Sequence, residues 1–81
     1  MKFSARLSIF YKDFILDPEG RSVLQKLKNL GFEEVQKVLV GKEIKVELEC
    51  PSLEVAHHKI SQMCDALLVN PIMESVQVEV D

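Results

Sequence analysis

Hydrophobic and polar residues alternate at the start of the chain, over residues 2–12. Polar side chains occupy most of the positions between the apolar ones. A period of two over this length is typical of a half-buried β-strand. The positions on the apolar face are Phe3, Ala5, Leu7, Ile9 and Tyr11.

A helix is predicted to begin at Asp17-Pro18-Glu19. Asp17 can accept a hydrogen bond from a free N–H of the first turn, and Pro18 suits the first helical position, where an N–H is not needed. Gly31 supplies a left-handed residue at the C-terminal end. The apolar residues between these ends recur at helical spacing: Val23, Leu24, Leu27 and Leu30.

Residues 34–49 are predicted to form two strands joined by a tight turn at Gly41-Lys42, because glycine tolerates the positive φ of such turns. The alternating apolar positions are Val38 and Val40 before the turn, and Ile44, Val46 and Leu48 after it.

A second helix is predicted to follow Pro51-Ser52, with Ser52 as its cap, and to end at Asn70-Pro71. Its expected buried stripe consists of Ala56, Ile60, Met63, Cys64, Leu67 and Leu68. Alternation at Val76, Val78 and Val80 predicts the last strand.

The resulting order, βαββαβ, predicts a single α+β domain over residues 1–81. Its expected form is two-layered and ferredoxin-like, with a four-stranded antiparallel sheet under two helices. The other face of that sheet is mostly polar but also carries Phe10 and Leu39. Such a mixed surface suits a protein partner.

The composition and charge of the chain exclude several classes of function and indicate an oligomer. A chain of 81 residues buries a small core, and its two cysteines are too few for a disulfide framework, so we expect a homodimer or larger oligomer. The net charge of −3 argues against nucleic-acid binding. No apolar run reaches membrane-spanning length, so no membrane contact and a cytoplasmic location are expected.

Candidate chemical groups have simpler structural interpretations. His57 and His58, with Met63 and Cys64, form a cluster that suggests a metal site, but adjacent histidines point about 100° apart on a helix and cannot easily share one ion. Cys64 lies on an apolar stripe, which favours packing over nucleophilic attack. Asp17 directly precedes a proline, and this position favours a role as a helix cap over a role as a general base. Gly41-Lys42 lacks the further glycines of a phosphate loop. No catalytic, cofactor-binding or metal site is therefore predicted.

Three segments together resemble the PurS family: Leu16 to Gly20, Val38 to Lys42, and Met63 to Pro71. Lys12 and Gly31-Phe32 also match that family in type and spacing. The similarity covers essentially the whole chain. The sequence departs from the family at Asp13-Phe14, where related chains usually carry a flexible stretch containing glycine.

The resemblance implies a non-catalytic subunit of phosphoribosylformylglycinamidine synthase. Such a subunit is expected to bridge a glutaminase subunit and a large synthetase subunit, which uses ATP and Mg²⁺, and to support ammonia transfer between them. Candidate partner contacts are Phe10, Lys12, Leu39, Gly41, Lys42, Asn70 and Pro71; Asp17, Pro18 and Gly31 are expected to be structural.

Two other classes share the βαββαβ order. A regulatory domain of the ACT type would bind a small molecule near residues 12–18 at a dimer interface. An acylphosphatase-like enzyme would need an arginine in the loop after the first strand, and residues 12–18 contain none. Small-molecule binding by the isolated chain would favour the first of these alternatives.

Overall fold

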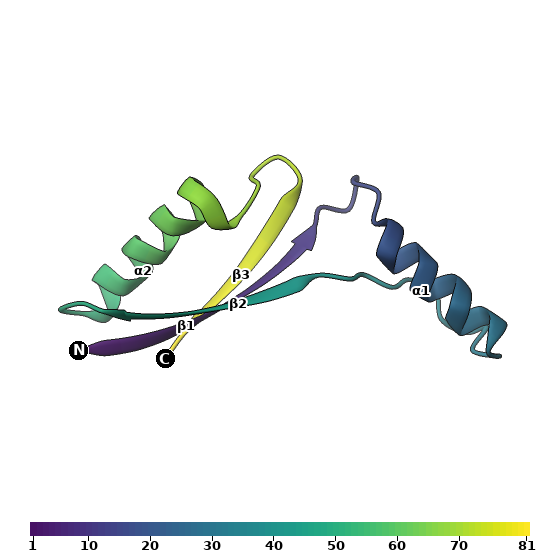
Figure 1. The fold of residues 1–81 in the computed structure, drawn as a ribbon, viewed down its shortest axis with the longest axis horizontal. Coiled ribbons are helices and arrows are strands. Elements are labelled where there is room, and N and C mark those ends of the chain that lie inside the picture. Colours follow the sequence, from purple (N-terminus) through teal and green to yellow (C-terminus); the bar gives the residue numbers. More distant parts are fainter.

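The computed structural model describes residues 1–81 and shows an α+β architecture that is drawn out along one axis (Figure 1). Neither α-helix is long and apolar enough to cross a membrane. The elements in chain order are β1 (Lys2–Tyr11), α1 (Pro18–Asn29), β2 (Lys42–Glu49), α2 (Leu53–Met63), the π-helical turn η1 (Cys64–Leu68) and β3 (Glu74–Val80).

The sheet has three antiparallel strands in the order β2-β1-β3, so β1 is central. Ile9 lies opposite Lys42 of β2 and Val76 of β3. Being paired on both sides makes β1 the most buried strand. The predicted alternation along it is confirmed from Phe3 to Ile9, whereas Tyr11, predicted on the same face, is exposed at the end of the strand.

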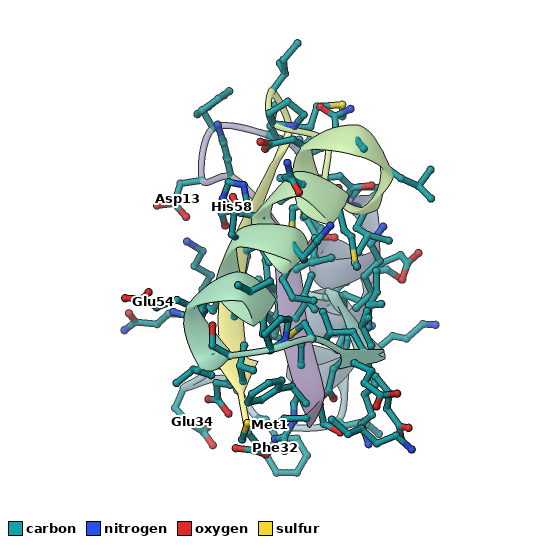
Figure 2. The ribbon with its side chains drawn as sticks, turned by 90° about the vertical axis from the view of Figure 1, so that its left-hand side faces the viewer. Met1, Asp13, Phe32, Glu34, Glu54 and His58 are labelled. Carbon is teal, nitrogen blue, oxygen red and sulfur yellow. The ribbon has the colours of Figure 1, made fainter.

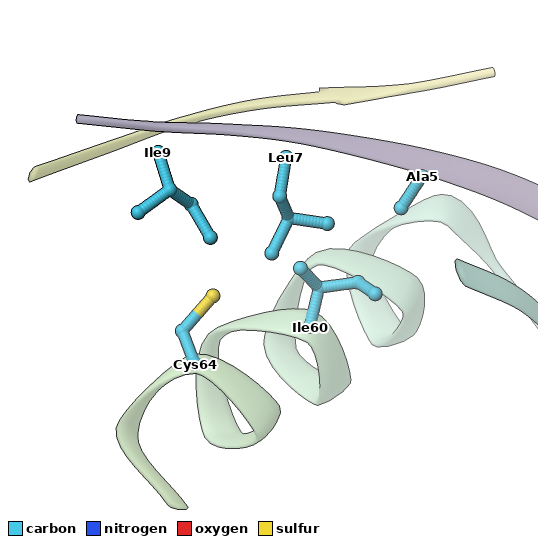
Figure 3. Packing of buried hydrophobic residues seen from close by; sticks show 5 residues of the cluster. All are labelled: Ala5, Leu7, Ile9, Ile60 and Cys64. Carbon is cyan, nitrogen blue, oxygen red and sulfur yellow. The ribbon is translucent and has the colours of Figure 1, made fainter. Parts of the chain in front are cut away.

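The core lies between the sheet and α2. Ile60 and Cys64 point from the helical segment toward Ala5, Leu7 and Ile9 of β1 (Figure 3). Leu7, Ile9 and Ile60 are at most 1% exposed. Only 9 of 81 residues are buried, so this core stabilises one end of the molecule and leaves the rest thinly packed.

Residues 13–40, here called the arm, extend beyond the sheet and carry α1 at the far end from α2 (Figure 1). The last residues of the arm, 36–40, run straight through Gly41 into β2, with no strand beside them (Figure 1). The molecule measures 51 × 24 × 14 Å, with a radius of gyration of 16.3 Å. A compact domain of this length would have a radius of gyration of about 12 Å.

The four-stranded sheet under two helices is therefore not what a single chain forms. The expected turn at Gly41-Lys42 is wrong, because Gly31 alone has a positive φ and Lys42 already pairs with Ile9 as the first residue of β2. With no turn, residues 36–40 cannot fold back beside β2. α1 lies beside that segment and away from the sheet, so only α2 covers the sheet.

Both ends predicted for α1 and the start predicted for α2 are confirmed, whereas the second helix was expected to reach Asn70-Pro71 and instead ends at Met63, followed by η1 up to Leu68. Asp17 caps α1 by accepting a hydrogen bond from the Gly20 N–H at 2.9 Å, and Pro18 is the first helical residue. Gly31 has a φ of 103° just after α1. Ser52 caps α2 through the Val55 N–H at 3.3 Å.

Some of the predicted apolar stripes are not buried. Leu67 is 83% exposed, because the wider π-helical turn η1 closes through the Val69 N–H and the Cys64 carbonyl and changes the phase of the helical stripe. On α1, Val23 is 39% and Leu30 is 74% exposed, since no strand packs extensively against that helix.

Candidate functional site

The predicted partner contacts lie at the junction, defined here as residues 10–12, 41–42 and 70–74, where the sheet meets the arm. These residues come from three separate parts of the sequence. The end of β1, the start of β2 and the turn before β3 meet there. Of the predicted contacts, Leu39 lies on the adjoining arm segment and the others belong to the junction: Phe10, Lys12, Gly41, Lys42, Asn70 and Pro71.

Lys12 fastens the turn before β3 to the end of β1. Its ammonium Nζ donates to the Pro71 carbonyl at 2.7 Å, and its backbone N–H donates to the Met73 carbonyl at 2.8 Å. A flexible cationic side chain thus holds two segments that are 59 residues apart in sequence.

Asn70 shapes that turn from within. Its side-chain Oδ1 accepts hydrogen bonds from the backbone N–H groups of Ile72 at 3.0 Å and Met73 at 3.2 Å, as asparagine does in Asx turns. The Asn70 N–H donates to the Glu74 carboxylate at 2.9 Å, and that carboxylate also pairs with Lys42 at 3.6 Å. The turn is therefore connected to the start of β2.

Gly41 is required by close packing and not by a turn. A Cβ at this position would overlap the Ile9 carbonyl and the ring of Phe10. Only glycine lets the extended chain pass the end of β1 this closely.

A hollow of about 190 Å³ opens at the junction and is lined partly by Asp17, Lys42 and Glu74. The charges of Lys42 and Glu74 offset each other there. The lining therefore has neither the cluster of cations that a phosphate needs nor a free group of carboxylates for Mg²⁺. Its mixture of polar and apolar groups suits contact with a protein surface.

Asp17 connects α1 to the extended segment of the arm. One carboxylate oxygen accepts from the Gly20 N–H, and the other accepts from the Val40 N–H, also at 2.9 Å. The Val40 bond and then the Gly20 bond hold the pKa of Asp17 below its ordinary value, and partial burial opposes them. A carboxylate with a lowered pKa and both oxygens occupied is a poor general base.

The thiols and imidazoles show no arrangement for catalysis. Cys64 is 7% exposed, and burial, followed by the nearby charge of Asp65, raises the pKa of its thiol. His58 lies on the outer surface of α2 with Glu54 (Figure 2), and His57 is also exposed. No group of three or more His, Cys, Asp or Glu side chains is placed to hold a metal ion.

Sequence reasoning missed two members of this network. It assigned Asp17 a single bond to α1 and did not find the second bond to Val40, which depends on the path of the arm. It also gave Glu74 no role. The four-residue spacing of Asn70 and Glu74 around Pro71 was the signal that could have identified a closed, hydrogen-bonded turn.

Comparison with known proteins places these features in one family. A sequence model described as PurS, phosphoribosylformylglycinamidine (FGAM) synthase, matches residues 4–81. The chain is 36% identical over 74 residues to the PurS subunit of phosphoribosylformylglycinamidine synthase from Archaeoglobus fulgidus, covering 91% of this chain and 92% of that protein. It is 33% identical to the Synechocystis subunit of the same name, with coverage of 96% and 78%.

Solved structures agree with the architecture. Thermus thermophilus PurS is 39% identical, with a TM-score of 0.85, covering all of this chain and 96% of that one. A chain in the structure of PurLQS from Thermotoga maritima is 28% identical, with a TM-score of 0.91 and coverage of 100% and 99%. None of these relatives supports the ACT-like alternative.

Proposed function

Because the chain belongs to the PurS family of phosphoribosylformylglycinamidine synthase subunits, which serve purine biosynthesis, we propose that it bridges two larger subunits of that enzyme. One is a glutaminase and the other an ATP-dependent synthetase. The chain supports passage of ammonia from the first to the second.

The elongated shape with two dissimilar ends is the observation that carries this proposal. The sheet and α2 form one end, and the arm with α1 forms the other, within a length of 51 Å (Figure 1). A small chain of this length can contact two partners at once. The close structural similarity to a chain of the PurLQS structure from Thermotoga maritima supports such a place in a complex.

The bond-making chemistry is assigned to the partners. The thiol chemistry belongs to the glutaminase, and ATP with Mg²⁺ acts in the synthetase. The junction suits a docking role because its charged groups, such as Lys42 and Glu74, are already paired with each other. We further propose a homodimer that works in the cytoplasm, in contact with neither nucleic acid nor membrane.

The junction is the proposed contact with a larger subunit. Reversing a charge there, as in Lys42→Glu, removes a cation and places a second carboxylate beside Glu74. Lys59→Glu makes the same charge change on the exposed face of α2, away from the junction, and is the matched control.

The test is co-elution of purified glutaminase and synthetase, monitored by light scattering. We expect the two to elute as one species with this chain and apart without it. Lys42→Glu should raise the concentration needed for assembly several-fold, whereas Lys59→Glu should leave it unchanged. Co-elution without this chain would contradict the proposal, and equal behaviour of the two variants would remove the junction from the contact.

A further inference from the structure

One side of the β3 backbone is free, because β3 is an edge strand that pairs only with β1. Ser4 and Asp81 exchange two backbone hydrogen bonds, at 3.3 and 2.9 Å, and this pair fixes the phase of the pairing. In an antiparallel ladder, such residues alternate with residues whose N–H and C=O groups point the other way. The residues of β3 whose backbone points away from β1 are therefore the even-numbered ones that follow Glu74: Val76, Val78 and Val80.

This free edge lacks the features that commonly protect an edge strand. β3 contains no proline or lysine, and its pairing with β1 continues without a bulge from Glu74 to Val80. The outward-pointing residues are all valine, which favours strands. An edge of this kind is a template for an added strand.

The two faces beside the edge have different side chains. The three valines are half-buried and pack against the core on the side of α2. The side chains on the opposite, open face of β3 are exposed and polar: Ser75, Gln77 and Glu79, with Asp81 next in the chain. A strand added to this edge would follow the same division, with apolar side chains toward α2 and polar ones on the open face.

Carboxylates surround the edge on both faces. Glu79 and Asp81 are exposed on the open face and form no ion pair. Arg6 lies opposite Glu79 in the sheet but pairs with Glu43 of β2, at 3.1 Å. On the other face, Glu54 projects from α2 on the side where β3 lies (Figure 2). The edge therefore favours a strand that carries cationic side chains.

The same charges disfavour a second copy of this chain at the edge. Two β3 strands paired antiparallel through their free sides would place two Glu79 and two Asp81 side chains on one face of the joint sheet. Like charges that meet across a strand pair are destabilising. The occupant is therefore a different protein.

The position of the edge indicates which protein supplies the strand. β3 begins in the junction, where Glu74 pairs with Lys42 at 3.6 Å, and the free edge starts two residues later at Val76. The two surfaces are continuous. A subunit that docks on the junction is therefore placed to reach the edge.

We propose that the larger subunit that docks on the junction adds an extended segment to the free edge of β3, as a further strand of the sheet. This step rests on the proposed bridging function and specifies how one of its contacts is made. The added segment alternates small apolar side chains, which face α2, with lysine or arginine side chains, which face Glu79 and Asp81. Backbone hydrogen bonds to the three valines attach the segment, and the charges select its register.

Proline substitution tests the backbone bonds. Val78→Pro removes an N–H that points away from β1, so the sheet should still form while the edge is blocked. Val78→Ala also loses the valine side chain but keeps the N–H, and is the matched control. Co-elution is measured with the larger subunit whose binding Lys42→Glu weakens. Val78→Pro should raise the concentration needed for co-elution by about tenfold, and Val78→Ala should change it little.

Charge reversal tests the chemistry of the added segment. Glu79→Lys combined with Asp81→Lys should weaken co-elution several-fold, because cationic side chains would then face each other. Glu33→Lys combined with Glu34→Lys makes the same change of charge at the tip of the arm and is the control. Equal effects of the two double variants would show that the segment is not cationic and would overturn that part of the proposal.

Amide hydrogen exchange tests the added strand in the parent chain, without any substitution. In the isolated chain, the amides of Val76, Val78 and Val80 should exchange faster than those of Gln77 and Glu79, which bond to β1. Binding of the larger subunit should slow the three valine amides by about tenfold or more. Unchanged exchange of these amides in the complex would overturn the strand addition, whether or not the proline variant folds.

Two further results would contradict the proposal. A folded Val78→Pro chain that binds like the parent would show that the edge is not used. A Val78→Pro chain whose own assembly has a lower mass in light scattering than the parent would assign the edge to a second copy. If Lys42→Glu still weakens assembly in these cases, the bridging function survives; if neither larger subunit binds the parent chain, the bridging function fails as well.

Discussion

At the scale of single residues, Asp17 has the most consequential contacts. Its two carboxylate oxygens hold two different backbone N–H groups, one in α1 and one in the extended segment. A helix cap alone explains the first contact, and serine or asparagine would serve there equally well. The second contact requires an acceptor at both side-chain oxygens, which only a carboxylate supplies.

Substitution of Asp17 separates these two contacts. Asp17→Ala should lower the melting temperature by roughly 5 °C or more, because it removes a cap and a second backbone bond. Asp17→Ser keeps the cap and should fall between the alanine variant and the parent. Thermal unfolding followed by circular dichroism measures both shifts.

The pH dependence supplies the control for this prediction. Because the folded pKa of Asp17 is lowered, its contribution is complete above the ordinary carboxyl pKa of 3.8 and is lost as the pH falls through the folded value. The parent and Asp17→Ser should therefore converge in acid. Equal melting of the parent, serine and alanine forms at neutral pH would show that neither bond matters for stability.

At the scale of elements, α2 and η1 provide a matched pair of apolar side chains. Ile60 is 1% exposed in the core, whereas Leu67 is 83% exposed on η1, although the sequence predicts both to be buried. Truncating Ile60 leaves a cavity beneath β1, and truncating Leu67 leaves none.

Urea unfolding of the two alanine variants tests this difference. Ile60→Ala should cost about 2–5 kcal/mol, a large part of the stability of a small domain. Leu67→Ala should change stability by less than about 0.5 kcal/mol. Comparable losses for both variants would mean that Leu67 packs against a surface in solution.

The first strand, the last strand and the starts of both helices could be predicted from the sequence because these are local properties. Alternation defines β1, and the caps at Asp17 and Ser52 depend on residues within one turn. The closed hairpin at Gly41 was wrong because a glycine suits both a turn and a close approach between backbones. Val40 and Ile44 are an even number of residues apart, so both would lie on the same face of an uninterrupted strand. This spacing across Gly41 is the feature of the sequence that indicates a straight strand.

The proximity of Lys12, Lys42 and Asn70 at the junction could not be predicted from local sequence, because it depends on the register of the sheet. Only the family resemblance points to these three residues, and it gives no account of why they lie together. Their packing partners, Glu74 and the Pro71 carbonyl, became evident only once β1 and β3 were paired.

At the scale of the whole molecule, the chain is elongated and has a small core at one end. Its radius of gyration of 16.3 Å exceeds that of a compact domain, and most of its apolar side chains outside β1 and α2 remain accessible. These properties suit a protein that is completed by its partners. They also explain how so short a chain can serve a multi-subunit enzyme, since it contributes surface rather than reactive groups.

The rate of synthesis with two nitrogen sources tests the bridging role most directly. Glutaminase and synthetase are assayed with and without this chain, using either glutamine or a high concentration of external ammonia. Bridging predicts that omitting the chain abolishes glutamine-dependent synthesis while ammonia-dependent synthesis continues at an unchanged rate. If synthesis from external ammonia also stops without the chain, the purely bridging role is contradicted, and the chain must help to shape the active site of the synthetase.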